Sequence, residues 1–143
     1  MKTAALLLLG STLLAAGCAT QPLTPEDAIH YAAAVAPDVY SDTYVMDVVA
    51  TGRQNGRIFL NSQEDYRDPH TLTIEILPSA LPAFKQAYGE DADAHFKGHR
   101  VTVLGEARRV TIWYLNQSGE RTGQSYYQTH IVVSDPDQIK IES

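Results

Sequence analysis

The stretch Leu72–Tyr88, LTIEILPSALPAFKQAY, decides the expected fold because a strand pattern is followed in it directly by a helix pattern. Its first five residues alternate between apolar and polar, which is typical of a strand with one buried face. Pro78 breaks the alternation. From about residue 80, Leu81 and Phe84 fall on one side of a helix that ends before Gly89. The stretch therefore predicts a strand and then a helix whose apolar side packs on the core.

Two strands are predicted before this stretch and two after it. They cover residues 45–51, 57–61, 101–115 and 126–133. Residues 52–56 form the first turn, in which Asn55-Gly56 is a strong hairpin signal. Gly105 marks a point at which the long fourth strand could bend. Residues 90–95 are expected to be a solvated loop, and residues 138–141 to close on the sheet.

The predicted order is three strands, a helix and two strands. This is the order of the OB fold, in which the helix between the third and fourth strands plugs one end of a barrel. We therefore predict a mainly β protein with a five-stranded OB-type barrel (β-β-β-α-β-β) over residues 45–143 and an extended hairpin between its last two strands. A ferredoxin-like fold would need a helix after the first strand, where residues 52–56 leave no room. A plain sandwich would not need the helix at residues 80–88.

A helix is also predicted near the start of the chain. Thr24 can cap it, Pro25 suits its first turn, and it should run to Val35 because Pro37 follows. Its apolar stripe is thin. The stripe consists of Ile29, Ala32, Ala33 and Ala36. We therefore expect a peripheral helix, so that residues 18–44 form a tether and a spacer rather than part of the core.

The first 17 residues have the features of a signal peptide. Lys2 gives a positive start, and the apolar run over residues 4–16 is too short to span a bilayer. The next motif, Leu14-Ala15-Ala16-Gly17-Cys18, resembles the lipobox of bacterial lipoproteins, although Ala15 stands where that family prefers Leu. The resemblance implies cleavage before Cys18, diacylglycerol on its thiol and acylation, such as palmitate, on its amine. Two or three acyl chains would anchor the protein stably to a membrane.

The residue after this cysteine indicates the membrane. Ala19 is not the Asp that retains enteric-type lipoproteins, so the resemblance implies transfer to the outer membrane, facing the periplasm, with the cell surface left open. Cys18 is the only cysteine, so it cannot form a disulfide within the chain.

A second resemblance concerns the C-terminal half. Residues 96–105 read FKGHRVTVLG and residues 131–139 read IVVSDPDQI. These motifs resemble the closing half of bacterial extracytoplasmic OB-fold domains, which often read KGK-x-V-x-V-x-G and later I-x-V-x-D-P-x-Q-I. The hairpin between them, residues 108–127, is longer than usual for the family. Related barrels bind single strands or act as staphylococcal-nuclease-type enzymes, so the resemblance implies the fold more firmly than an activity.

The charge of the chain argues against general binding of nucleic acid. The formal net charge is −6, and loss of Lys2 with the leader would make it −7. Nonspecific binding depends on neutralising phosphates with Lys and Arg. A local basic patch could override this, so single-strand binding stays an alternative.

Five residues are candidates for a ligand-binding face. They are Arg53, Arg57, Arg109, Trp113 and Tyr126. OB folds bind ligands across the second and third strands and the flanking loops. Aromatic rings beside arginines can stack on bases or sugars. The same aromatic residues could instead stabilise the hairpin by cross-strand packing.

The evidence for catalysis is weaker. A nuclease would need a carboxylate cluster and arginines. Residues of these types are Asp47, Arg53, Arg57, Glu64 and Asp65, but their spacing does not match the nuclease family and solvated charges explain them. A metal site from Asp91, Asp93, His95 and His99 lacks the spacing of a calcium loop or a helical His pair. No metal or cofactor is expected.

The sequence thus predicts a membrane-anchored, noncatalytic binding or scaffold lipoprotein of the bacterial envelope, whose partner is an envelope protein or a glycan. Single-stranded nucleic acid or oligosaccharide binding on the OB face is the first alternative. A metal-dependent nuclease is the second, so catalysis stays open.

Overall fold

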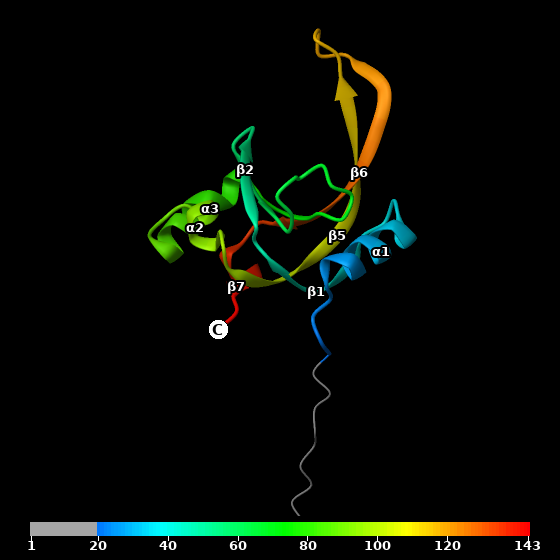
Figure 1. The fold of residues 1–143 in the computed structure, drawn as a ribbon. Coiled ribbons are helices and arrows are strands. Elements are labelled where there is room, and N and C mark those ends of the chain that lie inside the picture. Colours follow the sequence, from blue (N-terminus) through cyan, green and yellow to red (C-terminus); the bar gives the residue numbers. More distant parts are fainter. Residues whose placement is uncertain (1–19) are drawn as a thin grey trace, which may run out of the picture.

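A computed structural model describes residues 20–143 of the chain, so the expected signal peptide and Cys18 lie outside the described residues. The fold is mainly β (Figure 1). The helices are α1 (Pro25–Val35), α2 (Leu81–Tyr88) and α3 (Ala92–Phe96), with short 3-10 turns at Pro78–Ala80 and Pro136–Gln138. The strands are β1 (Tyr40–Asp47), β2 (Ala50–Gln54), β3 (Arg57–Asn61), β4 (Leu72–Ile76), β5 (Arg100–Leu115), β6 (Arg121–Val133) and β7 (Ile139–Ile141).

The strands form one sheet in the order β1-β5-β6-β4-β3-β2, and β7 pairs with β5 outside this path. All neighbours are antiparallel except β4 and β6, which are parallel. The prediction of five strands was wrong, because seven are formed. Within the described residues, β1 and β2 end the path and do not pair with each other, so the hydrogen-bonded strand path is open.

The extra strands arise near the two ends of the sheet-forming part of the chain. The predicted first strand is two strands, β1 and β2, separated by Val48 and Val49. Val48 bonds to the turn before β5, because its N–H donates to His99 O and its carbonyl accepts from Gly98 N. The N–H of Val49 instead donates to Asn61 O of β3. These opposite partners divide the strand. The final segment adds β7, which pairs with the start of β5.

The first hairpin turn is tighter than predicted. Residues 52–54 belong to β2, and the turn is Asn55-Gly56 alone. Both residues have positive φ, 51° and 74°, as a two-residue turn between twisted strands requires. The Asn-Gly signal was therefore correct, but the turn extends over fewer residues.

One face of the sheet and the helices α1, α2 and α3 enclose the core. The buried strand residues include Ile58, Leu60, Leu72, Ile74, Ile76, Val101, Val103, Ile131, Val133 and Ile139. Phe84 of α2 is fully buried against them, as the sequence predicts, and Leu81 packs at the edge. The alternation of apolar and polar residues that predicted the strands thus corresponds to the alternation of buried and less buried side chains.

Gly105 lies where β5 passes very close to β6. A Cβ atom at this position would lie 2.7 Å from Cγ2 of Ile131, which is fully buried. Such a distance is far below van der Waals contact, so the two strands can approach only because residue 105 has no side chain.

α1 is not peripheral, which corrects the prediction. Ala28 and Ala32 are fully buried in the main core, and of the predicted stripe only Ala32 is among the buried residues. Leu23 orients α1 on the sheet. Its N–H donates to Thr43 O and its carbonyl accepts from Val45 N, so the chain is already attached to β1 where it enters α1. Residues 20–23 are therefore not wholly a free tether.

Residues 90–95 are not a solvated loop, since α3 begins at Ala92. Ala92 and Phe96 are buried, one helical turn apart, and Phe96 contacts the rings of Phe84 and Tyr88 edge-on. The charged residues between these two apolar positions led to the wrong prediction.

β5 and β6 run on beyond the rest of the sheet as a projecting hairpin (Figure 1). We call this hairpin the arm and define it as Arg108–Leu115 and Arg121–Gln128. Among residues 20–143, no helix has both the length and the apolar character needed to cross a membrane.

Candidate functional site

A groove of about 670 Å³ lies on the face of the sheet that points away from the core. The β2–β3 hairpin forms one side, the base of the arm forms the other, and the loop over residues 62–70 contributes to the rim. We call it the sheet groove. The residues that decide its chemistry are Arg57, Phe59, Asn61, Glu64, Tyr66, Thr73, Glu75, Tyr126, Gln128 and His130.

Strand alternation puts these side chains on one face. On β3, Ile58 and Leu60 point into the core, so residues 57, 59 and 61 face the groove. On β4, residues 73 and 75 do the same between buried neighbours, and on β6 His130 lies opposite Thr73 in the parallel register. The groove floor is therefore fixed by the same pattern that builds the core.

The floor holds a chain of polar side chains. Arg57 Nε lies 2.7 Å from Glu75 Oε1 as an ion pair, although its angle falls outside hydrogen-bond geometry. Glu75 Oε2 lies 3.2 Å from His130 Nδ1, and His130 Nε2 lies 2.8 Å from Gln128 Oε1. Both imidazole nitrogens and both carboxylate oxygens thus have a partner within the floor.

Gln128 links this floor to the two walls. Its Nε2 donates to the Tyr66 carbonyl in the 62–70 loop, at 3.2 Å, and to the Tyr126 hydroxyl on the arm, at 3.0 Å. Because the Tyr66 carbonyl can only accept, it fixes the orientation of the amide. The loop and the arm are therefore held through one side chain.

Burial and the neighbouring Glu75 carboxylate have opposite effects on the pKa of His130. Only 7% of His130 is exposed, and burial lowers its pKa, an effect that the hydrogen bond and charge of Glu75 oppose. Arg108 lowers the pKa further. The net effect is a lowered pKa, so His130 takes up a proton less readily than a free imidazole does.

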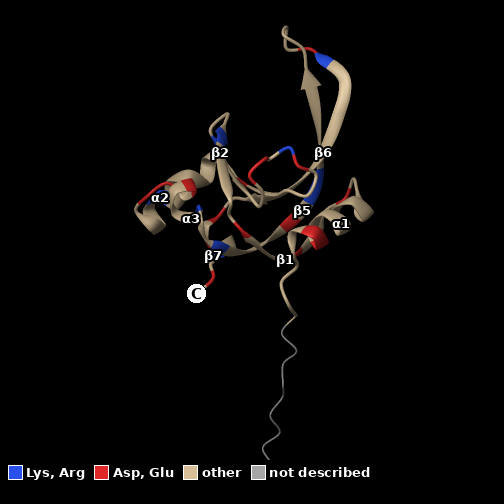
Figure 2. Ribbon diagram, in the orientation of Figure 1, with Lys and Arg blue, Asp and Glu red and all other residues tan. Residues whose placement is uncertain are grey.

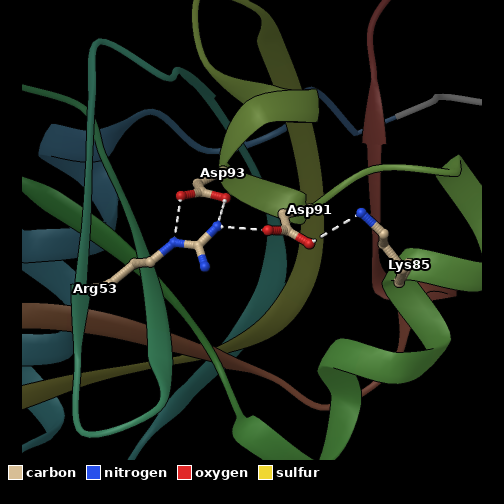
Figure 3. Close-up of polar contacts among 4 residues, drawn as sticks. All are labelled: Arg53, Lys85, Asp91 and Asp93. Carbon is tan, nitrogen blue, oxygen red and sulfur yellow. Dashed lines mark hydrogen bonds and ion pairs between the residues drawn. The ribbon is translucent and has the colours of Figure 1, made fainter.

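Arg53 also borders the groove, but its guanidinium is directed elsewhere (Figure 3). Nε and Nη2 bond to the two carboxylate oxygens of Asp93 at 2.7 and 2.6 Å, and Nη2 also bonds to Asp91 at 2.9 Å. Asp91 in turn accepts from Lys85 of α2 at 3.3 Å. These bonds lower the pKa of both Asp carboxyls. Arg53 therefore connects the β2–β3 hairpin to α3.

The five candidate residues do not form one face. Arg57 and Tyr126 line the sheet groove together, and Arg53 borders it. Arg109 and Trp113 lie on the other face of the arm, because Tyr126 pairs with Ile112 and not with Trp113. The outer face has its own pairs: the guanidinium of Arg109 lies 4.3 Å from the Tyr127 ring centroid, and Arg121 lies 5.0 Å from that of Trp113.

The residues considered for a nuclease or a metal site are dispersed. Asp47 pairs with Arg100 at 3.2 Å, Glu64 lies in the sheet groove, and Asp91 and Asp93 hold Arg53. In the described part of the chain, no three His, Cys, Asp or Glu side chains are grouped so that they could hold a metal ion.

Sequence reasoning missed the centre of the site. In the sequence, Glu75 is a polar residue of an alternating strand, and no metal or catalytic motif includes His130. The available signal was that Thr73 and Glu75 alternate with apolar residues at 72, 74 and 76, and that Gln128 and His130 show the same two-residue spacing before Ile131.

Charges of both signs are scattered over the described ribbon (Figure 2). Lys and Arg occur singly or in pairs on several strands and are not gathered along one element. The charged residues that line the groove are two Arg (Arg53 and Arg57) and two Glu (Glu64 and Glu75), so the lining is not basic.

Comparisons with known proteins identify neither a family nor a curated relative of this chain. No protein-family model matches the chain, and no curated protein matches it. Among solved structures, an aspartyl tRNA synthetase from Entamoeba histolytica matches 94% of this chain with 9% sequence identity and a TM-score of 0.47. The chain spans 24% of that protein's length. A likeness of this extent carries no argument about what the chain does.

Proposed function

We propose that the protein is a lipid-anchored, noncatalytic binding protein of the bacterial envelope, and that its sheet groove holds a ligand close to a membrane. The groove has the volume of an ordinary ligand site and mixes aromatic with polar side chains. The partner is an envelope protein or a glycan.

One observation carries the choice of binding over catalysis. The acid–base groups at the centre of the groove floor contact one another, since Glu75 lies between Arg57 and His130, and His130 lies between Glu75 and Gln128. A general base needs a nitrogen or oxygen directed at the substrate. Glu75 and His130 are instead directed at other side chains of the floor, which suits recognition.

We also propose that the sheet closes as an OB-type barrel. The two ends of the strand path, β1 and β2, are consecutive in the chain and are joined by Val48 and Val49, which bond to opposite neighbours. The parallel pair β4–β6 and the position of α2 between β4 and β5 agree with that fold. In such a barrel the sheet groove lies on the usual ligand face.

The anchor is Cys18, whose lipid would hold the domain at the outer membrane. Leu23 is attached to β1, and it lies five Cα–Cα steps along the chain from Cys18. At about 3.5 Å per residue, this segment spans roughly 18 Å at most. Residues 20–23 leave the body on the side opposite to the arm (Figure 1), so the arm would point away from the membrane.

Replacing the cysteine tests the anchor. We expect Cys18→Ala to abolish incorporation of labelled palmitate and to release the protein from the membrane fraction. Circular dichroism of the released protein should keep the β signature, because residue 18 precedes the first pairing at Leu23. Palmitate incorporation by the variant, or membrane retention without it, contradicts the proposal.

Turnover tests the noncatalytic part. We expect the full-length protein to leave three substrates unchanged, with or without added magnesium or calcium. They are isolated envelope polysaccharide, envelope protein and, in a plasmid-nicking assay, supercoiled plasmid. Product formation that disappears in Glu75→Gln would instead make the groove an active site and refute the proposal.

A further inference from the structure

We infer that the sheet groove binds a neutral oligosaccharide. This inference rests on the proposed binding function and names the ligand class of the same site. Three properties of the groove carry it: the cancellation of its charges, the kind of hydrogen-bonding groups on its floor, and the placement of its aromatic rings.

The first property is that the cations are already neutralised. Arg57 is paired with Glu75 at 2.7 Å, and Arg53 is held by Asp91 and Asp93. The His130 ring lies 3.2 Å from the Glu75 carboxylate, and burial lowers its pKa. Glu64 adds a further negative charge to the lining. An anionic chain would therefore meet carboxylates and paired guanidinium groups.

The second property is that the remaining polar groups are amides and hydroxyls. On the floor, Thr73 Oγ1 donates to Asn61 Oδ1 at 2.9 Å, and Gln128 lies at the centre. Thr51 and Gln54 extend this character along β2. Amides and hydroxyls each supply both donors and acceptors, as sugar hydroxyls do. The amides and hydroxyls of the groove can therefore pair with sugar hydroxyls without removing a charged group from water.

The third property is that aromatic rings lie on the floor of the groove, on the 62–70 loop and at the base of the arm. Phe59 lies on the floor beside His130, Tyr66 lies on the loop with 47% of its surface exposed, and Tyr126 lies at the base of the arm. Such rings bury large apolar area, and a tyrosine also presents a polar group. The C–H faces of sugar rings can pack on them while the hydroxyls meet the amides.

Single-stranded nucleic acid fits the charges less well. Its bases could stack on the same rings, but its affinity comes largely from phosphates that must meet unpaired Lys or Arg. Freeing Arg57 for a phosphate would leave Glu75 uncompensated beside it. We therefore make nucleic acid an outcome of the test.

The test measures binding to the full-length protein in a detergent without a sugar headgroup. The probes are a β-1,4-linked N-acetylglucosamine tetramer, maltotetraose and a twelve-nucleotide thymidine strand. Calorimetry gives the affinity, and amide NMR shifts locate the site. We expect at least one sugar to shift the resonances of Thr73, Gln128 and His130, with little change in affinity between about 50 and 200 mM salt, over which phosphate-dependent binding would fall steeply.

Adjacent tyrosines provide matched variants. Tyr126 faces the groove, whereas Tyr127 faces the opposite side of the same strand with 53% of its surface exposed. We expect Tyr126→Ala to weaken sugar binding about tenfold, the size of one lost ring contact. Tyr127→Ala should change it less than twofold, and Tyr126→Phe should restore most of it.

Two results would overturn the inference. One is that neither sugar shifts the groove resonances at millimolar concentration. The other is that the thymidine strand binds in the groove more tightly than the sugars and loses affinity as salt rises. In that second case the groove still binds a ligand, so the proposed function stands although the ligand class is wrong. Turnover by the groove would instead refute the proposed function.

Discussion

The contact between Gly105 and Ile131 leads to a quantitative prediction. Gly105→Ala places a Cβ 2.7 Å from Ile131 Cγ2, roughly 1 Å inside the usual contact distance. Ile131 is fully buried and branched at Cβ, so it cannot rotate away at low cost. β5 and β6 must therefore move apart.

Overpacking of this kind costs about 1–3 kcal/mol in free energy of unfolding. For a small domain whose unfolding free energy falls by roughly 1–3 kcal/mol per molar urea, we expect the unfolding midpoint to drop by about 1 M. The strand conformation adds no penalty, since the φ of Gly105 is not in the left-handed region.

Urea unfolding followed by circular dichroism measures the effect. Gly52 is the matched control, because it also lies within a strand but a Cβ there would meet no atom within 4 Å. Gly52→Ala should leave the midpoint unchanged or raise it slightly. Ile131→Leu removes the Cγ2 methyl, so adding Gly105→Ala to that variant should cost clearly less than it does in the wild type.

Two outcomes would refute the reasoning. Equal midpoints for Gly105→Ala and Gly52→Ala would mean that the strands separate freely at this position. An undiminished penalty in the Ile131→Leu background would mean that some other contact is responsible.

Three further predictions concern caps and charges. Thr24→Ala should lower the free energy of unfolding by about 1 kcal/mol, measured by thermal unfolding, because Thr24 caps α1. The Arg53 guanidinium lowers the pKa of Asp93, so the free energy of unfolding should decrease as pH falls below the usual pKa range of Asp. In Arg53→Gln, the urea midpoint should decrease less over the same pH range. The pKa of His130 is lowered by burial, so stability should fall as pH drops from about 6.5 towards the lower folded pKa. NMR titration should show that Glu75→Gln lowers this pKa further, whereas a rise would contradict the assigned pairing.

Local patterns predicted the elements well where one face is buried. Leu72–Ile76, α2 with its buried Phe84 and the cap at Thr24 all follow from spacing and end signals. The division of the first strand could not be predicted, because it depends on partners from distant segments bonding to Val48 and Val49.

The candidate site was predicted less well for a related reason. Parity within one strand correctly puts Arg109 and Trp113 on one face of β5, but the face of Tyr126 depends on the register between strands. That register pairs it with Ile112. The link from Glu75 to His130 likewise joins β4 to β6, which are 55 residues apart at these positions and have no local signal in common.

The long strand β5 joins two regions with different local stability. Its first half, Arg100–Ala107, lies in the sheet against β1, whereas beyond Ala107 its recorded strand partner is β6 alone. Amide hydrogens should therefore exchange slowly in the first half and much faster towards Leu115, within one continuous strand. The arm can melt and re-form while the core stays intact. One wall of the groove is thus a segment whose order a bound ligand would itself increase.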